Sequence, residues 1–473
     1  MQSVHFSPFQ GTWYPERRAE LERLLQDRLE ESRARIGCFP FTEALAFVTP
    51  HAGPAYSGTV AAAAYRALQL SKPERIVVLA FPHHGGLRGI AVPDVDAIST
   101  PLGEVAISPG LAGEFPPVAE ERVCDHSFEI QLPFLQQVAP QARVAPLYVG
   151  RTTAGERARA ASALASEWRP GTVFVASSDF THYGRDFGFV PFPTDGSAPR
   201  RLHELDGECI EAAGSLDSSL FRDTLRETAA TVCGSEPIAL LLDILTILGG
   251  DDIYQSTLDY QTSGEITGDY HHSVSYAALG YCRREALQLT PADCEALLDS
   301  AAETLACLRG SGRREPVEAR GSSALGAQRG VFVSLHQGEK LLGCLGNCSG
   351  REPLSVQVPD LAVSAALEDP RFRPAAEVAG PIDIEISVLT PFKRITSADQ
   401  LRVHRHGAML RLGECSGLLL PQVADRYDWT GEQFLEAVTR KSMLGPHAWK
   451  DPQARLSVFE AQVFSRPGLP GRS

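Results

Sequence analysis

The sequence has few basic residues for its size: 44 Lys and Arg stand against 58 Asp and Glu, for a net charge of −14. Nucleic acids and acidic membrane surfaces attract basic proteins, so we expect neither as a partner. A long apolar run is also missing, because the longest, Ile238 to Leu248, is interrupted by Asp243 and is too short to span a bilayer. The first residues lack the basic and apolar regions of a secretion signal. These absences together predict a cytoplasmic protein.

The ten cysteines are scattered over 473 residues and form no dense framework. Such spacing, without a secretion signal, predicts reduced thiols rather than disulfides. The sequence also lacks the phosphate-binding pattern G-x-x-x-x-G-K-[ST] and the zinc-protease pattern H-E-x-x-H. A P-loop nucleotide hydrolase and a protease of that type are therefore not expected.

The first part of the chain alternates short apolar runs with helix-like stretches. Residues 44–49, 75–80, 143–149 and 172–177 have the pattern of buried strands, and 56–70 and 153–168 have Ala-rich helical periodicity. Repeated strand–helix–strand units predict a largely parallel sheet covered on both faces, closed by a strand over 273–281. We expect an α/β domain over residues 1–284.

A different pattern follows. Thr290-Pro291 begins a helix with a cap residue and a proline in the first turn. Residues 310–330 are rich in Gly, Ser and Arg, which predicts a flexible loop. From Val331 the pattern indicates hairpins, and 382–388 alternates as a half-buried strand does. We expect an α+β domain over residues 285–473.

Ionisable residues follow three of the predicted parallel strands. His51 follows the first, His83 and His84 follow the second, and Asp179 and His182 follow the fourth. The carboxyl ends of parallel strands form the edge of an α/β sheet at which ligands bind. A single histidine is more often structural than functional, but two histidine positions at equivalent strand ends favour a site more than one does.

Cys233 lies just ahead of the helical run 238–245, with Ser235 as its expected cap. Unpaired N–H groups at a helix N-terminus favour thiolate, the form of cysteine that binds metal ions. In the segment 124–133, His126 and Glu129 would share one helix face, where they could hydrogen-bond to metal ligands and orient them. His84, which follows the second strand, could have the same role. The alternative for Cys233 is a buried thiol with no ligand role. The alternative for the segment 124–133 is a capped helix on the surface.

Six motifs resemble the Memo family in order and spacing, over nearly all of residues 5–282. They are Gly11-Thr-Trp-Tyr-Pro15, His51-Ala-Gly-Pro-Ala-Tyr-Ser-Gly58, His83-His84, Asp125-His-Ser-Phe-Glu-Ile-Gln-Leu-Pro133, Ser177-Ser-Asp-Phe-Thr-His-Tyr183 and Thr231-Val-Cys-Gly234. The family fold is similar to that of LigB-type class III extradiol dioxygenases, which are non-haem iron enzymes. The resemblance implies metal ligands at His51, His83 and Cys233, with His182 at the position of the dioxygenases' acid/base histidine.

The second domain resembles the AMMECR-type domain. The similar segments are Phe332-Val-Ser-Leu-His336, Gly343-Cys-Leu-Gly346, Asp369-Pro-Arg-Phe372, Ile384-Glu-Ile-Ser-Val-Leu-Thr-Pro391 and Leu418-Leu-Leu-Pro-Gln-Val423. The family's Leu-Arg-Gly-Cys has become Leu341-Leu-Gly-Cys344 here. The two halves together look like a fusion of proteins B and A of the AmmeMemoRadiSam system. That resemblance implies a radical-SAM protein as a partner.

Two imidazoles and one thiolate leave coordination positions open on a divalent ion, and they favour Fe(II), although Cu or Zn also fits. His182 could move a proton near neutral pH, and Asp179 could orient it. Three hypotheses stay open. The protein is a metal-dependent redox enzyme, dioxygenase-like in its use of oxygen; or it is a scaffold that binds a small molecule or peptide without chemistry. The third, compatible with either, is an accessory role beside the radical-SAM partner.

Overall fold

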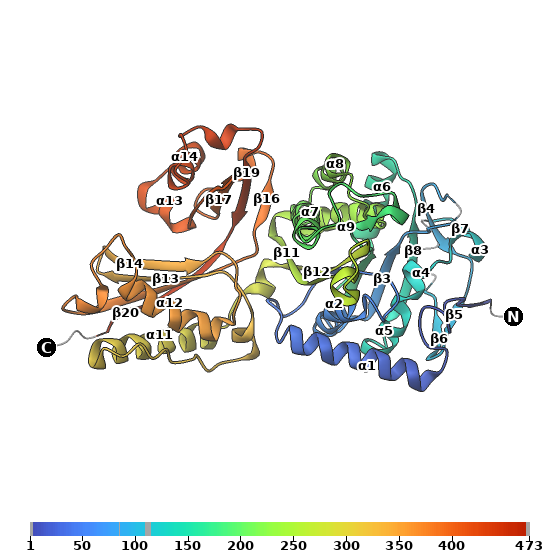
Figure 1. The fold of residues 1–473 in the computed structure, drawn as a ribbon, viewed down its shortest axis with the longest axis horizontal. Helices are drawn as coiled ribbons and strands as arrows, with labels where there is room; N and C mark the ends of the chain where they lie inside the picture. The colour runs from blue at the N-terminus through green and yellow to red at the C-terminus, as the bar shows by residue number, and fades with distance from the viewer. Residues whose placement is uncertain (1–2, 85, 109–114, 470–473) are drawn as a thin grey trace. The chain divides into compact units, whose positions relative to one another are not determined.

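The structure, a computed structural model, describes residues 3–84, 86–108 and 115–469. The chain divides into two compact units, shown as a ribbon in Figure 1. The first comprises Met1–Ile36 and Thr42–Ala286, and the second comprises Gly37–Phe41 and Leu287–Ser473. The short segment 37–41 is grouped with the second unit although it lies within the first in the sequence. No pattern in the sequence predicted that residues 37–41 would belong to the second unit.

A mixed sheet forms the centre of the first unit, with nine strands among the described residues in the order β10-β12-β2-β9-β3-β8-β4-β7, and β11 paired with β12. The four strands expected from the sequence are neighbours and run parallel. The expected closing strand is antiparallel to β2. In chain order the strands are β2 (Ala46–Thr49), β3 (Arg75–Ala80), β4 (Ile90–Pro93), β7 (Pro117–Val118), β8 (Arg143–Val149), β9 (Thr172–Ser177), β10 (His182–Gly184), β11 (Ile253–Thr262) and β12 (His272–Arg283).

Helices cover both faces of this sheet. Every residue of β2 and β9 is buried, as parallel strands require when helices pack on each side. Figure 1 shows α1, α2 and α5 on one side and α6, α7, α8 and α9 on the other. Their bounds are α1 (Arg18–Arg35), α2 (Gly58–Leu70), α5 (Gln131–Val138), α6 (Ala154–Ser166), α7 (Ala198–Gly214), α8 (Ser218–Thr228) and α9 (Ser235–Gly249).

The first strand of the chain belongs to a separate three-stranded sheet. Strand β1 (Val4–Phe6) pairs in parallel with β5 (Ala97–Thr100), which pairs with β6 (Gly103–Ala106). Two short helices, α3 (Glu120–Val123) and α4 (His126–Glu129), precede α5. Figure 1 shows β5, β6, α3 and α4 on the same side of the first unit. Strand β1 and the segment 120–129 are in contact, since His5 Nδ1 lies 3.0 Å from Glu120 Oε2.

The second unit contains two four-stranded antiparallel sheets among its described residues, in the orders β14-β13-β15-β20 and β16-β19-β17-β18. Helices α11 (Pro291–Ser311) and α12 (Leu354–Leu367) pack on the first sheet, and α13 (Pro421–Tyr427) and α14 (Gly431–Lys441) accompany the second. The strands are β13 (Val331–Gln337), β14 (Lys340–Asn347), β15 (Ile382–Leu389), β16 (Lys393–Ile395), β17 (Gly407–Leu412), β18 (Cys415–Leu419), β19 (Arg455–Phe459) and β20 (Ala461–Leu469).

The segment expected as a flexible loop, 310–330, has little regular structure after α11 apart from a 3-10 turn over Ser323–Gly326. Two of its apolar side chains, Ala319 and Leu325, are nevertheless buried in the core of the second unit. The backbone N–H of Ser322 also donates to Asp293 on α11. The segment is therefore packed against the unit over part of its length.

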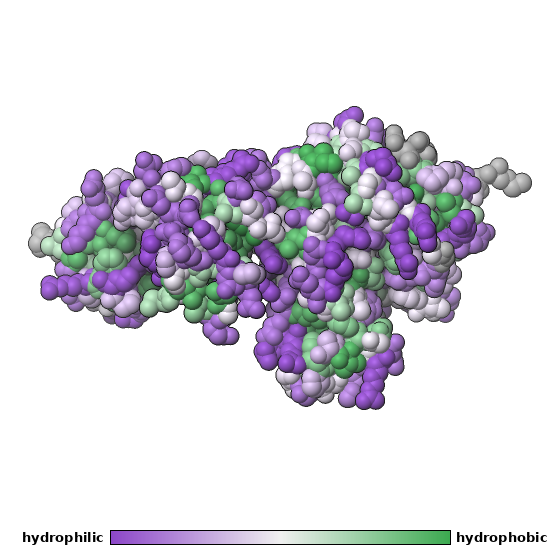
Figure 2. Space-filling model, turned by 90° about the horizontal axis from the view of Figure 1, so that it is seen from above, coloured by the Kyte–Doolittle hydropathy of each residue, from purple (hydrophilic) through white to green (hydrophobic). Residues whose placement is uncertain are grey.

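No helix in the described ranges is both long and apolar enough to cross a membrane. On the face displayed in Figure 2, hydrophilic and hydrophobic residues are interspersed.

Candidate metal centre

The sheet brings the predicted histidines to one edge. His51 follows β2, His83 follows β3 and Asp179 follows β9, and these three parallel strands are neighbours. Cys233 lies in the turn that precedes α9, and this helix packs on β9 and β3. Gly234 allows this close approach, because a Cβ there would lie 2.5 Å from the carbonyl oxygen of Ser177.

The three predicted ligands converge. One ligand atom from each of His51, His83 and Cys233 lies within 4.8 Å of the other two. The Nε2 atom of His51 is 3.1 Å from the sulfur of Cys233. The rings of His51 and His83 are nearly perpendicular, with centroids 5.2 Å apart. Two nitrogens and a sulfur are therefore close enough together to be ligands of a single ion.

Hydrogen bonds fix the tautomer of His51. Its Nδ1 lies 2.9 Å from Ser177 Oγ. That hydroxyl donates its only proton to the carbonyl of Ser127, so it accepts from His51. The proton of the imidazole is thus on Nδ1, and Nε2 directs a lone pair toward Cys233. Burial, followed by the nearby His126 and His83, lowers the pKa of His51 well below its ordinary value, so the ring is neutral.

Asp125 orients His83 in a similar way. Its Oδ1 lies 2.9 Å from His83 Nδ1, and its Oδ2 accepts from the His83 backbone N–H at 3.1 Å. Burial by itself would raise the pKa of Asp125, but the hydrogen bond from His83 and the charges of His126 and His83 outweigh it, and the net pKa is lowered. An ionised carboxylate behind an imidazole is the usual partner of a metal-binding histidine.

The expected thiolate at Cys233 is not favoured. Burial and then the charge of Asp179 raise the pKa of this thiol, and they outweigh the hydrogen bonds with Asp179, Ser178 and the Gly234 backbone, which lower it. The helix also begins one residue earlier than expected, with Gly234 rather than Ser235 as the cap. Without a bound cation the sulfur is protonated, and a metal ion would displace that proton.

Asp179 does not orient His182 as predicted. Its Oδ1 accepts from the backbone N–H groups of His51 and Ala52, at 2.8 and 3.3 Å, so it holds the turn that carries the first ligand. His182 Nδ1 instead lies 3.0 Å from the carbonyl oxygens of both Phe180 and Thr231. Since carbonyls only accept, the Nδ1 atom of His182 carries a proton.

The three residues expected behind the ligands have different positions. The ring of His126 stacks on that of His83, with centroids 4.2 Å apart, and so belongs to the site. His84 is exposed, and its charge contributes to the lowered pKa of His126, after burial and other neighbours. Glu129 instead faces His5, 3.1 Å from its Nε2. The structure thus gives Glu129 a different neighbour from His126, although both lie on the short helix α4.

Sequence reasoning missed four residues at the site. Asp125 and Ser177 orient the two imidazoles, Gln131 donates to Ser177 at 2.9 Å, and Trp13 packs on His126 with ring centroids 4.5 Å apart. One signal was available: Asp125 directly precedes a helical turn and accepts from the Ser127 N–H, as an N-cap carboxylate does.

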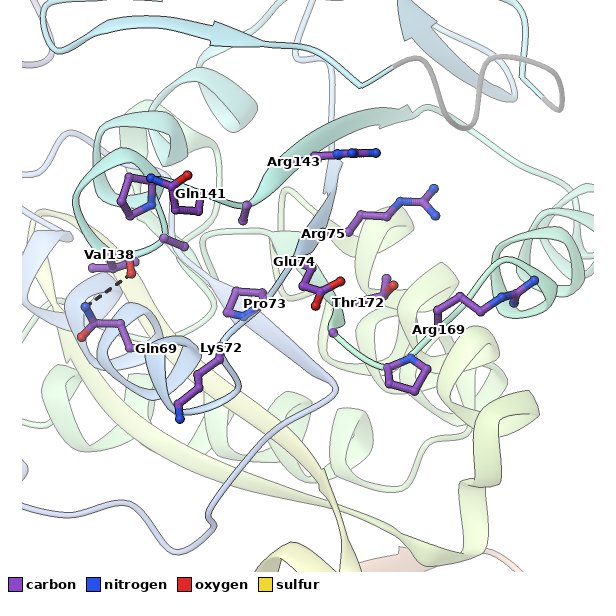
Figure 3. Close-up of a pocket in the computed structure, with 15 residues that line it drawn as sticks. Gln69, Lys72, Pro73, Glu74, Arg75, Val138, Gln141, Arg143, Arg169 and Thr172 are labelled. Carbon is purple, nitrogen blue, oxygen red and sulfur yellow. Dashed lines mark hydrogen bonds between the residues drawn. The ribbon is translucent and has the colours of Figure 1, made fainter.

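A hollow of about 820 Å³ lies at the opposite edge of the sheet (Figure 3). Arg75, Arg143 and Thr172 line it, and these are the first residues of β3, β8 and β9. The histidines follow the last residues of the parallel strands, so this hollow does not belong to the candidate centre.

Comparison with known proteins agrees with the motifs. A family model described as Memo-like protein matches residues 8–280, and one described as AMMECR1 matches residues 298–464. The chain is 30% identical over 284 residues to the protein memo-1 homolog of Caenorhabditis elegans, which covers 57% of this chain and 79% of that protein. It is 30% identical over 300 residues to a MEMO1 family protein of Thermococcus kodakarensis, covering 59% of this chain and all of that one, 100%.

Protein MEMO1 of Mus musculus is 30% identical over 287 residues, covering 57% of this chain and 94% of its own length. Among solved structures, an uncharacterized protein of Pyrococcus horikoshii is 29% identical, with a TM-score of 0.35, and covers 37% of this chain and 95% of that one. Because the Memo-like match spans more than half of the sequence, this protein belongs to the Memo family, and it carries an AMMECR1 domain after its Memo-like domain.

Proposed function

We propose that this protein is a metal-dependent redox protein that binds Fe(II) through His51, His83 and Cys233 and uses dioxygen to oxidise a small-molecule or peptide ligand. The observation that carries the proposal is the convergence of three ligand atoms, each within 4.8 Å of the others, from three distant segments. The tautomer of His51 supports it further, since the Nε2 lone pair faces the cluster.

The donor set suits a first-row transition metal. Two neutral imidazoles and one thiolate would leave a divalent ion with one net positive charge and with open positions. Bound Fe(II) would supply binding of dioxygen and one-electron chemistry at those positions. Cu and Zn also accept nitrogen and sulfur ligands, so the identity of the metal is part of the proposal.

The surrounding residues have separate roles in this proposal. Asp125 and Ser177 hold the two imidazoles in their binding orientations. His182, whose Nδ1 faces the carbonyl oxygens of Phe180 and Thr231, would accept or return a proton at Nε2. The family's likeness to LigB-type dioxygenases supports a reaction with oxygen. Ring cleavage of a catechol does not follow, because a thiolate replaces the carboxylate ligand and is itself oxidisable.

The direct test is metal analysis and oxygen uptake of protein purified without air. We expect about one equivalent of iron at this cluster, and oxygen consumption that depends on it. Cys233→Ser should lose both, whereas Cys307→Ser, which removes an exposed thiol of the second unit, should lose neither. Iron and oxygen uptake that survive Cys233→Ser would contradict the proposal.

The alternative is a scaffold role without chemistry. Every His, Cys and carboxylate cluster with metal-binding spacing found in the described residues lies in the first unit. In this alternative the AMMECR1 domain would dock a radical-SAM protein. Equal ligand binding by metal-free and metal-loaded protein would favour this alternative. A pull-down with the full chain that recovers no radical-SAM protein would count against the docking role.

A further inference from the structure

A second group of potential ligands includes Cys124 and Glu129, which stand on either side of Asp125 in the sequence. One ligand atom each from His5, Cys124 and Glu129 lies within 4.8 Å of the other two. His5 comes from β1, Cys124 from the link between α3 and α4, and Glu129 from the end of α4. The Nε2 atom of His5 is 3.1 Å from Glu129 Oε1. None of these three residues belongs to the first cluster.

Glu129 is the unusual member. Its exposure is 0%, and its Oε2 is buried without a hydrogen-bond partner. Carboxylate oxygens removed from water are almost always paired, because an unpaired one costs free energy. An unpartnered oxygen beside an imidazole and a thiol is the atom that a bound cation would pair with.

A carboxylate contacts the ring nitrogen of His5 that does not face Glu129, as is usual for metal-binding histidines. The Nδ1 atom of His5 lies 3.0 Å from Glu120 Oε2, so one carboxylate orients the ring while Nε2 faces Glu129. A carboxylate on the far nitrogen fixes the tautomer and raises the basicity of the coordinating nitrogen. The His5 and Glu120 side chains are 14% and 35% exposed, which gives an ion a route from solvent.

We propose that His5, Cys124 and Glu129 form a second metal site, for Zn²⁺. Imidazole, thiolate and carboxylate are all zinc ligands, and the two anions would neutralise the ion. The buried Glu129 Oε2 or a water molecule could take the fourth position. The competing arrangement has no metal, with a doubly protonated His5 bridging Glu120 and Glu129, and it is an outcome of the test below.

A metal ion at this site would link β1, through His5, to the segment 124–129, which contains residues that support the first cluster. His5 lies 124 positions from Glu129 and 115 from Glu120 in the sequence. Between Cys124 and Glu129 lie Asp125, which orients His83, and His126, which stacks on it. A zinc ion here would therefore have a structural role, and would hold these supports in place without taking part in chemistry.

The test uses the full chain in a Cys233→Ser background, so that the first cluster contributes no thiolate. Co²⁺ is the probe, because thiolate coordination gives it a near-ultraviolet charge-transfer absorption. We expect one equivalent of Co²⁺ with that absorption, displaced by Zn²⁺. Cys124→Ser should abolish the absorption, and the matched control Cys307→Ser should retain it.

Glu120→Ala provides a second variant that removes no ligand. Its Zn²⁺ affinity should fall about 10–100-fold. Thermal melts of each variant establish that it is folded. Absence of Co²⁺ absorption in Cys233→Ser, or its persistence after Cys124→Ser, would overturn the proposal. Because the background already lacks Cys233, these results do not depend on whether the first cluster binds iron.

Discussion

The Nε2 atom of His51 lies 3.1 Å from the sulfur of Cys233, although 182 positions separate the two residues in the sequence. The contact depends on two independent features of the fold. Ser177, at the end of β9, accepts the Nδ1 proton and turns the lone pair of Nε2 toward the sulfur. Gly234 lets the turn before α9 lie against the end of the same strand. Both features can be tested by single substitutions.

Ser177→Ala should weaken metal binding without removing a ligand. The substitution removes the acceptor for the His51 Nδ1 proton, so the tautomer with the lone pair on Nε2 loses its preference. We expect the dissociation constant for the metal to rise about 10–100-fold, measured by competition with a chelator. Ser166→Ala, at the exposed end of α6, is the control and should bind as the unaltered protein does. Equal affinities for both variants would show that Ser177 does not orient the ring.

Gly234→Ala should disrupt the cluster by displacing Cys233. The added Cβ would lie 2.5 Å from both the Ser177 carbonyl oxygen and Ser178 Cβ, and neither can move freely. We expect a loss of stability of about 1–3 kcal/mol and loss of stoichiometric metal. Gly207→Ala is the matched control: nothing lies within 4 Å of its added Cβ, and it sits inside α7. That variant should gain about 0.5–1 kcal/mol and bind metal normally.

His182→Gln should separate proton transfer from metal binding. The amide of Gln can still donate toward the Phe180 or Thr231 carbonyl, but it cannot exchange a proton as an imidazole does. We expect bound metal to be unchanged, and metal-dependent oxygen uptake to fall about 10²–10⁴-fold with an altered pH profile. Loss of the metal itself in this variant would mean that His182 is a ligand and would contradict the assigned role.

Asp369→Asn should reduce the stability of the second unit in a pH-dependent way. Asp369 accepts from Arg371 Nη2 at 2.6 Å and from the Cys344 N–H at 2.9 Å. The hydrogen bond from Arg371, opposed by burial, lowers the pKa of Asp369 to about 2. A lowered carboxyl pKa stabilises the folded state above the unfolded pKa, near pH 4, and that stabilisation is lost as the pH falls toward 2.

The difference in unfolding free energy between the unaltered protein and Asp369→Asn should therefore be largest above pH 4, at about 2 kcal/mol, and should shrink toward zero near pH 2. Denaturant titrations at several pH values measure it. A difference that stays constant over this range would show that the charge of Asp369 does not contribute.

Much of the first unit could be predicted because its signals are local. The runs 75–80, 143–149 and 172–177 match β3, β8 and β9 residue for residue, since buried parallel strands need continuous apolar sequence. The helix at 291 also begins as expected, with Thr290 accepting from the Asp293 N–H. Side-chain pairing was predicted less well. Asp179 was assigned to His182 and Glu129 to the first cluster, but they bond to the 51–52 turn and to His5.

The sequence alone determined the α/β order of the first domain and placed His51 and His83 after neighbouring strands, because hydrophobic periodicity and strand ends are properties of short segments. Tertiary structure alone decided which carboxylate serves which imidazole, and that the Cys233 thiol is protonated when no cation is bound. Those outcomes depend on distance and burial between segments that meet only when the chain folds. Asp125 and His83 are 42 positions apart, and His51 and Asp179 are 128 apart, so no local pattern could specify either pair.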